Sequence, residues 1–227
     1  MMGPVNGKVR AWLPGPVRRM GRAVRSAPAK VRHATRTERL TLYRLPVPPP
    51  GELARLWADG PQVELTPADE ELIDRMKAQH PKLLNDRKER ILRSRIGSMA
   101  EQCLVLTQGD DIVGYCHIAR GDNLNERINH LVRLGPHEVY LFDTHVFKPF
   151  RGRGLHRASI LARLELVAGE GMAGVVTVIS DGNEASIRSF RRLGAEPTAR
   201  LVHVPRFGRT VERRIRRRRG ATQEQQS

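Results

Sequence analysis

The sequence predicts a single mixed α/β domain of the α+β kind, with a central sheet of about six to seven strands flanked by about four helices. Residues 38–45 alternate apolar and polar side chains, which is the period of a half-buried strand. Residues 174–180 form an unbroken apolar run, which is typical of a strand buried on both faces. Residues 138–170 have the pattern of a strand, a glycine-containing loop and an amphipathic helix. We expect this last unit at the centre of the sheet.

The segment that follows the first strand contains two expected helices. The proline-rich stretch VPPPG interrupts regular structure, and residues 62–66 can form a short strand. A helix should open with Thr66 as its N-cap and Pro67 at its first helical position, and Pro81 should end it. A second helix is expected from about Asp86 to Met99, because apolar residues there fall on one side.

Residues 102–119 are predicted to form a β-hairpin around a two-residue Gly109-Asp110 loop. That loop pairs residue 108 with residue 111, and a regular register then brings Cys103 opposite Cys116. A disulfide at this place is geometrically demanding, and a metal site needs more ligands than the neighbourhood offers. We therefore interpret the two cysteines as reduced thiols that pack as small hydrophobic side chains.

The second half of the chain has the clearest pattern. A polar stretch at 120–136 should be a loop or a short helix. The elements expected after it are a largely buried strand at 138–147, a helix from Leu155 to Glu170, the strand at 174–180, a helix from Asn183 to Leu193 closed by Gly194, and a hairpin of strands at 198–204 and 209–215.

The net charge of +16 is concentrated at the two ends of the chain. Residues 1–44 hold eleven Lys and Arg but one acid, residues 205–220 hold eight Arg but one acid, and the middle of the chain is neutral. We divide the chain into a basic Pro/Gly/Ala/Arg-rich extension at 1–37, a folded domain at 38–215 and a basic, polar tail at 216–227. No secretory signal and no long apolar stretch is visible, so we expect a cytoplasmic protein.

The basic ends leave several partners open. They attract nucleic acid, anionic lipid or an acidic protein, or they only keep the chain in solution. Apolar residues near helical spacing within 1–37 allow a short amphipathic helix at the inner membrane face, and the same Arg-rich composition suits an organelle transit peptide. The arginine run at 213–219 fits phosphate contacts, but few aromatic residues lie between the arginines to stack on bases.

The most informative segment is the loop Lys148-Pro149-Phe150-Arg151-Gly152-Arg153-Gly154-Leu155-His156, between the strand at 138–147 and the following helix. Its glycines let the backbone approach a ligand, and the N–H groups and dipole at a helix start favour an anion. A phosphate or pyrophosphate is the ligand that this arrangement predicts. The spacing fits neither a Walker loop nor the dinucleotide fingerprint. An ordinary turn with exposed arginines is the alternative.

The stretch from about 138 to 195 resembles the cofactor-binding half of the GNAT superfamily of N-acetyltransferases. In that family a strand ends in a V-x-P-like turn and continues as R/Q-x-x-G-x-G/A into a helix. A strand and a helix that opens with Asn then follow. Here these places are taken by Pro149, Arg151, Gly152, Gly154 and Asn183. The upstream segment matches only in the order of its elements, and residues 1–37 do not match.

The resemblance implies that acetyl-CoA, or another acyl-CoA, is the co-substrate, and that no metal takes part. It implies direct attack by a primary amine on the thioester. The residues expected to contact the cofactor are Phe147, Arg151, Gly152, Arg153, Gly154, Leu155, His156 and Asn183, with Asn183 on the pantetheine arm. Asn183 is also predicted from its residue type to be the N-cap of the helix that it opens.

Three positions depart from the family pattern. His156 stands where Gly or Ala is usual, and Phe147 stands where Val is usual. Phe190 stands where many members carry a tyrosine that reprotonates the CoA thiolate. The resemblance therefore supports acyl-CoA binding more firmly than it supports a particular acid, and a weak or inactive member is an alternative.

A base must take the proton of the attacking amine, and three residues on the 138–147 strand are candidates. Glu138 has the spacing to Gly152 of the catalytic glutamate in the histone acetyltransferases of this superfamily. Asp143 is a carboxylate within an apolar run, which is costly unless it is paired or used. His145 would share a face with Asp143 on a regular strand, where an Asp–His pair could orient a base, although a bulge would change this. Each has a structural alternative: a solvated charge, a hydrogen bond or a core histidine.

Three functions compete on this basis. The first is an N-acyltransferase that acts on a small amine, a peptide or an amino sugar. The second is a basic nucleic-acid- or ribosome-associated protein that uses the same scaffold without catalysis. The third is an acyltransferase held at a membrane face by its basic N-terminus. The acceptor itself carries no recognisable motif in the sequence.

Overall fold

The fold was analysed in a computed structural model that describes residues 37–58, 60–98 and 100–215. These residues all belong to the larger of two units into which the chain divides, residues 35–227. The basic extension, its amphipathic helix and the basic tail expected from the sequence lie outside the described residues.

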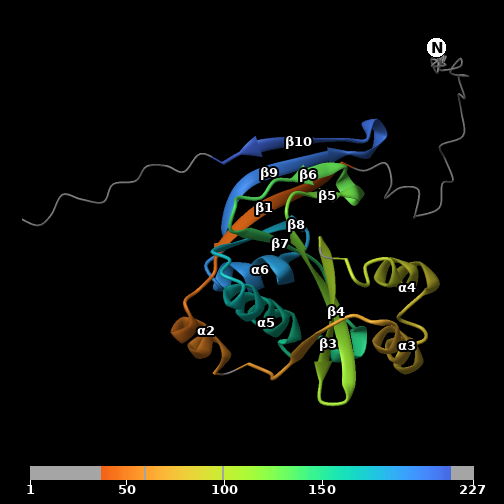
Figure 1. The fold of residues 1–227 in the computed structure, drawn as a ribbon. Coiled ribbons are helices and arrows are strands. Elements are labelled where there is room, and N and C mark those ends of the chain that lie inside the picture. Colours follow the sequence, from red (N-terminus) through yellow and green to blue (C-terminus); the bar gives the residue numbers. More distant parts are fainter. Residues whose placement is uncertain (1–36, 59, 99, 216–227) are drawn as a thin grey trace, which may run out of the picture. The chain divides into compact units, whose positions relative to one another are not determined.

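The described residues form five α-helices, ten strands and three short 3-10 turns (Figure 1). The helices are α2 (Pro50–Trp57), α3 (Glu70–Gln79), α4 (Asp86–Arg93), α5 (Leu155–Gly169) and α6 (Glu184–Arg192). The strands are β1 (Glu38–Pro46), β2 (Glu64–Pro67), β3 (Glu101–Gln108), β4 (Asp111–Arg120), β5 (Asn123–Asn125), β6 (His130–Val132), β7 (Glu138–Val146), β8 (Gly174–Ser180), β9 (Glu196–Val204) and β10 (Arg209–Arg214).

Eight strands form one mixed sheet in the order β10-β9-β1-β8-β7-β4-β3-β2, and β5 and β6 form a separate two-stranded ribbon. The large sheet is antiparallel except for the central pair β7 and β8, which run parallel because α5 connects them. The fold class is therefore confirmed. The large sheet has one strand more than the upper end of the expected range, and the described residues hold one helix more than expected.

Helices cover both faces of the sheet. On one face, Leu53 of α2, Leu161 of α5 and Phe190 of α6 share a core with strand residues such as Val175. On the other face, α3 and α4 pack on β3 and β4 through Ile73 and Leu92, among others. Figure 1 shows α3 and α4 on the side of the sheet opposite to α2 and α5. Within the described residues, no helix has the length and hydrophobicity needed to cross a bilayer.

Two expectations for the first half of the fold were wrong. Thr66 and Pro67 do not open a helix, because they pair with β3 as part of β2; α3 starts at Glu70, and Asp69 caps it by accepting a hydrogen bond from the N–H of Leu72. The helix expected to reach Met99 ends at Arg93, after which the chain turns. Helix α2 was not expected, because its Pro-rich start was interpreted as a break, whereas Pro50 fits a first helical turn.

The β3–β4 hairpin has the expected loop but not the expected register. Residues 108 and 111 pair as predicted, but the register shifts beyond them, so that Cys103 lies opposite His117 rather than Cys116. The cause is one extra residue in β4, Val113, which forms a β-bulge. The two cysteines consequently point to opposite faces of the sheet, and both are buried free thiols.

Candidate functional site

A cavity opens where the two parallel strands separate. β7 and β8 pair only from Glu138 to Tyr140, and no pairing between them follows in the described residues. Ligands of open α/β sheets bind in such a crevice outside the carboxyl ends of parallel strands. The cavity has a volume of about 540 Å³, and it is lined by Thr144, His145, Val146, Phe150, Arg151, Gly152, Gly154, Leu155, His156, Arg157, Asn183, Ala185, Ser186, Ser189 and Arg192.

The loop between β7 and α5 presents free backbone N–H groups to this cavity. A short turn closed by hydrogen bonds from Phe150 and Arg151 to Phe147 and Lys148 ends the strand. Beyond this turn, Gly152 and Gly154 adopt φ values of 82° and 77°, which residues other than glycine rarely adopt. Within the described residues, no acceptor takes the N–H groups of residues 152–157, and the first backbone bond of α5 runs from Ala158 to Gly154. These N–H groups and the helix dipole form a cup for an anion.

Two arginine side chains, those of Arg151 and Arg192, lie at the cavity beside this cup. Arg151 donates from its Nε to the carbonyl oxygen of Val146, 3.0 Å away, and so ties the loop to the end of β7. Arg192 lines the cavity from α6. Arg153 does not line the cavity, and its guanidinium lies 5.4 Å above the ring of Phe150.

Six of the eight expected cofactor-binding residues line the cavity: Arg151, Gly152, Gly154, Leu155, His156 and Asn183. Phe147 does not, because it is fully buried beneath α3 and α4. Asn183 also caps α6, since its Oδ1 accepts a hydrogen bond from the N–H of Ser186. Its two expected roles, cap and cavity residue, are therefore compatible.

His156 and Phe190 lie together beside the cavity, where the family pattern has smaller or hydroxylated residues. Their rings are 6.4 Å apart in an edge-to-face arrangement, and Phe190 is almost fully buried. Burial, and then the charge of Arg163, lowers the pKa of His156 to about 4. Its Nδ1 is buried and has no hydrogen-bond partner within the described residues. His156 is therefore a neutral imidazole with an unused ring nitrogen.

A β-bulge in β7 positions two of the candidate catalytic residues. The register with β4 shifts between the pairs Tyr115–His145 and His117–Phe142, which leaves one extra residue in β7. Asp143 lies in this bulge with φ at 46°, an unusual value for a residue other than glycine. Its carboxylate is half exposed, and it lies 3.8 Å from the guanidinium of Arg95.

His145 follows the bulge and lies between two cavities. Its ring stacks on Tyr115 with centroids 5.3 Å apart, and its Nε2 lies 3.4 Å from the Nζ of Lys88. Burial, followed by the charges of Lys88 and Arg151, lowers the pKa of His145 to about 4. The imidazole is therefore neutral at pH 7, and it is a weaker base than a free histidine. No hydrogen bond joins its side chain to Asp143 in the described structure, so the expected Asp–His pair does not form.

The second cavity lies on the other side of His145. It has a volume of about 310 Å³ and is lined by Asn85, Arg87, Lys88, Ile91, Leu92, Tyr115 and Asp143. His145 contacts this lining through Lys88 and Tyr115, while it forms part of the wall of the larger cavity. Two ligands, one bound in each cavity, could therefore come together at His145.

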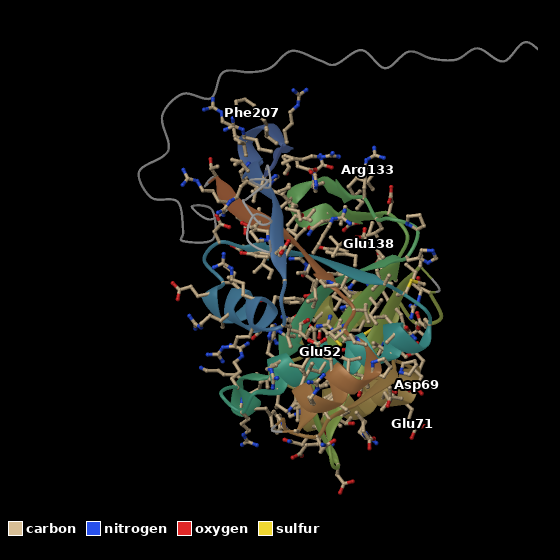
Figure 2. All side chains as sticks on the ribbon, turned by 90° about the vertical axis from the view of Figure 1, so that its left-hand side faces the viewer. Glu52, Asp69, Glu71, Arg133, Glu138 and Phe207 are labelled. Carbon is tan, nitrogen blue, oxygen red and sulfur yellow. The ribbon has the colours of Figure 1, made fainter. Side chains whose placement is uncertain are left out.

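Glu138 lies away from both cavities. It starts β7 at the end where β7 and β8 are still paired, it forms an ion pair with Arg44, and its Oε2 accepts a hydrogen bond from the N–H of Gly135 at 2.7 Å. Seven residues of strand separate it from His145, which is roughly 20 Å. In Figure 2 Glu138 lies on the Arg133 side of the domain, well separated from Asp69 at the start of α3. These contacts point to a structural role.

The sequence did not indicate two residues that support the site. Arg163 of α5 is completely buried, and it donates hydrogen bonds to the carbonyl oxygens of Ser159 and His117 and to the Oγ1 of Thr144. The only indication of Arg163 in the sequence was its position as a charged residue on the apolar face of a predicted helix. Gly114 of β4 lies against the backbone of His145 so closely that no side chain fits between them.

Within the described residues, no group of three or more His, Cys, Asp or Glu could hold a metal ion.

Comparison with known families gives one match. Residues 69–195, more than half of the chain, match the family model described as the acetyltransferase (GNAT) family. This match includes both cavities, α5 and the cap of α6. Comparison with curated protein sequences finds no match.

Solved structures with a similar fold include several acetyltransferases. The GCN5-related glucosamine N-acetyltransferase region of a fungal multi-domain GH3 β-N-acetylglucosaminidase has 11% identity and a TM-score of 0.52, over 78% of this chain and 23% of that one. A conserved protein from Staphylococcus epidermidis ATCC 12228 has 13% identity and a TM-score of 0.49 over 77% of this chain; this chain spans only 65% of its length. The aminoglycoside N-acetyltransferase AAC(6')-Iy, solved with CoA, has 15% identity and a TM-score of 0.45 over 60% of this chain and 90% of that one. At 11% identity, the likeness to the glucosamine N-acetyltransferase region shows the fold alone.

Proposed function

Since the chain belongs to the GNAT acetyltransferase family, we propose that it transfers an acetyl group from acetyl-CoA to a primary amine by direct attack. The observation that carries this proposal is the cup of free N–H groups at residues 152–157, which faces a cavity of about 540 Å³. A diphosphate is the anion that suits several neighbouring N–H groups at a helix start. Arg151 and Arg192 add charge-assisted hydrogen bonds for its oxygens.

The cavity leads from this cup to the bulge of β7. Asn183, at the start of α6, offers an amide to the polar arm that links the diphosphate to the thiol. The reacting carbonyl would then lie near Thr144 and His145, which line the same cavity. The buried guanidinium of Arg163 donates a hydrogen bond to the Oγ1 of Thr144, and its positive charge would stabilise negative charge on the thioester oxygen near Thr144.

The reaction requires one bond to form and one to break. The amine nitrogen forms a bond to the carbonyl carbon, and the carbon–sulfur bond breaks to release the CoA thiolate. His145 is the residue placed to accept the amine proton, directly or through water, because it is neutral and lies between the two cavities. The buried Phe190 cannot donate a proton to the thiolate, so solvent would supply it. A thiolate is a fair leaving group and does not depend on a strong acid.

The acyl-CoA site can be tested by thermal unfolding with and without CoA. A ligand at one hundred times its Kd stabilises a folded protein by about 2.7 kcal/mol, which for this size corresponds to a rise in Tm of roughly 5–10 °C. Gly152→Val should abolish that rise, because a valine at a φ of 82° distorts the backbone that presents the N–H groups of the cup. Gly171→Val is the matched control: it too has a positive φ with open space, but it lies after α5, away from the cavity. If millimolar CoA left the Tm of the unaltered protein unchanged, the proposal would fail.

The role of His145 can be tested separately. His145→Gln should lower kcat for acetyl transfer by about 10²-fold while the CoA-dependent rise in Tm stays intact. Glu138→Gln should leave kcat within about twofold, because Glu138 lines neither cavity. A larger loss of kcat in the glutamate variant than in the histidine variant would assign the base to Glu138 instead.

A further inference from the structure

The smaller cavity carries an uneven distribution of charge. Lys88 and Arg87, at the start of α4, both line it. Neither forms an ion pair with any residue in the part of the chain that the structure describes. Lys77 and Arg93 share the carboxylates of Glu70, Asp74, Asp86 and Glu89 between them. These four carboxylates are therefore engaged by Lys77 and Arg93, and Lys88 and Arg87 at the cavity are left without an ion pair among the described residues.

Lys88 is partly buried, which makes its lack of a counter-ion costly. Its Nζ has two polar neighbours among the described residues, the carbonyl oxygen of Leu83 and the Nε2 of His145, and both are 3.4 Å away. These are long, weak contacts for an ammonium group with three donors. An anionic oxygen in the cavity would supply the missing partner.

The cavity also contains a carboxylate at its other wall. Asp143, held out by the β7 bulge, lines the cavity together with Tyr115. A protonated amine is attracted by this carboxylate and repelled by Lys88. A ligand with one charge of each sign would satisfy both walls, whereas a simple ammonium would leave Lys88 unpaired.

We propose that the acceptor is a zwitterionic amine, whose carboxylate or phosphate binds Lys88 and Arg87 while its ammonium group lies against Asp143 beside His145. This inference rests on the acetyl transfer proposed above and names the class of its acceptor. The Nζ of Lys88 and the Nε2 of His145 are 3.4 Å apart. An acceptor that contacts both, at about 3 Å each, must carry its anionic oxygen within about 9 Å of its amine. Short amino acids and aminoalkyl phosphates meet this condition.

The charge of the acceptor also acts on the base. Lys88 is the largest electrostatic contribution to the lowered pKa of His145, after burial. An anionic group on Lys88 opposes that contribution and moves the pKa of His145 back towards neutrality, where a general base is most effective. Binding of an anionic acceptor thus raises the pKa of His145, the base that accepts the proton of its amine.

Two matched pairs of acceptors test the proposal: β-alanine against β-alaninamide, and phosphoethanolamine against ethanolamine. Within each pair the primary amine is retained, while the carboxylate is converted to a neutral amide in the first pair and the phosphate is removed in the second. Transfer from acetyl-CoA is followed by release of the CoA thiol. We expect kcat/KM to be at least tenfold higher for an anionic member than for its neutral partner. Comparison of the two pairs shows whether a carboxylate or a phosphate is bound.

Lys88→Met should remove this preference by raising KM for the anionic acceptor, whereas transfer to the neutral acceptor should not fall, because the charge that lowers the pKa of His145 is removed as well. Lys82→Met is the matched control, because Lys82 is exposed and lines neither cavity, and it should keep the preference. Equal use of both members of each pair, or an equal loss for both in Lys88→Met, would overturn the inference. So would a failure to acetylate any of the four compounds while CoA still raises the Tm. If CoA does not raise the Tm of the unaltered protein, it is the transferase proposal that fails.

Discussion

Replacing Gly114 by alanine tests whether the close approach of β4 to β7 holds the site in place. Gly114 is buried in β4 and pairs with Val146, the residue that follows His145. A Cβ at this position would overlap the carbonyl oxygen of His145 and lie 3.1 Å from the Cα of Val146. Both atoms belong to the backbone, so no side-chain rotation can relieve the overlap.

The cost follows from how far β7 must move. Ordinary van der Waals contact begins at about 3.4 Å, so the backbone at His145 has to retreat by roughly 1 Å. Overpacking of this kind destabilises a protein by about 1–3 kcal/mol, which for this size lowers the Tm by roughly 2–12 °C. A displacement of 1 Å in a catalytic group costs about 10²-fold in rate. Since the N–H groups of the cup lie beyond the turn at residues 147–151, CoA binding should be affected less than catalysis.

Thermal unfolding and acetyl-transfer kinetics measure the two effects on the same samples. Gly51→Ala is the matched control, because a Cβ at Gly51 meets nothing within 4 Å and its φ is not positive. The control should keep the wild-type kcat and the wild-type Tm, or slightly raise the latter, since alanine is favoured in a helix. If Gly114→Ala unfolded at the wild-type temperature and kept its wild-type kcat/KM, the close approach would have no role in positioning His145.

Buried polar groups give three further expectations. Burial, and then Arg95, lowers the pKa of His117 from 6.5 to about 3. Below pH 6.5 the unfolded chain therefore binds a proton at His117, whereas the folded chain does not. The contribution of His117 should lower the free energy of unfolding by about 2–3 kcal/mol between pH 7.5 and pH 4.5. His117→Phe should remove that part of the slope in urea titrations, and an unchanged slope would contradict it. Burial raises the pKa of Cys103 to about 12 and also that of Cys116, so both thiols should react with Ellman's reagent only on unfolding; rapid reaction of either one in the native protein would refute this. Arg163→Met should leave the free energy of unfolding unchanged or raise it by about 1–2 kcal/mol, because no carboxylate in the described residues offsets the desolvated guanidinium; a loss above about 2 kcal/mol in denaturant titrations would show that its hydrogen bonds outweigh this cost.

Elements with a clear local signal could be predicted from the sequence. The strand at 174–180 has its expected bounds, because a continuous apolar run fits a strand buried on both faces. The cap at Asn183 and the Gly109-Asp110 loop were also correct, since both depend on neighbouring residues in the chain. Helix α2 was missed because a proline run predicts a break unless the first turn of a helix can hold it.

The bulges could not be predicted, because an inserted residue changes pairing without changing composition. Val113 and Asp143 each add one residue to a strand, and each moves the register of every pair beyond it. The expected contact between Cys103 and Cys116 was wrong for this reason. The uncompensated charge of Lys88 was equally invisible, since it depends on where α4 packs against β7 rather than on the sequence of α4.

The bulge at Asp143 explains why a histidine of the central strand lines the larger cavity and also contacts Lys88 and Tyr115 of the smaller one. Before the bulge, Phe142 packs on the face that carries the β5–β6 ribbon. Without an extra residue, positions of even number would continue on that face, and His145 would point towards α5. Instead Thr144 contacts Arg163 of α5, and His145 stacks on Tyr115 on the opposite face. One inserted residue therefore moves His145 from the face covered by α5 to the wall between the anion cup and the charged cavity, where the proposed transfer requires a proton acceptor.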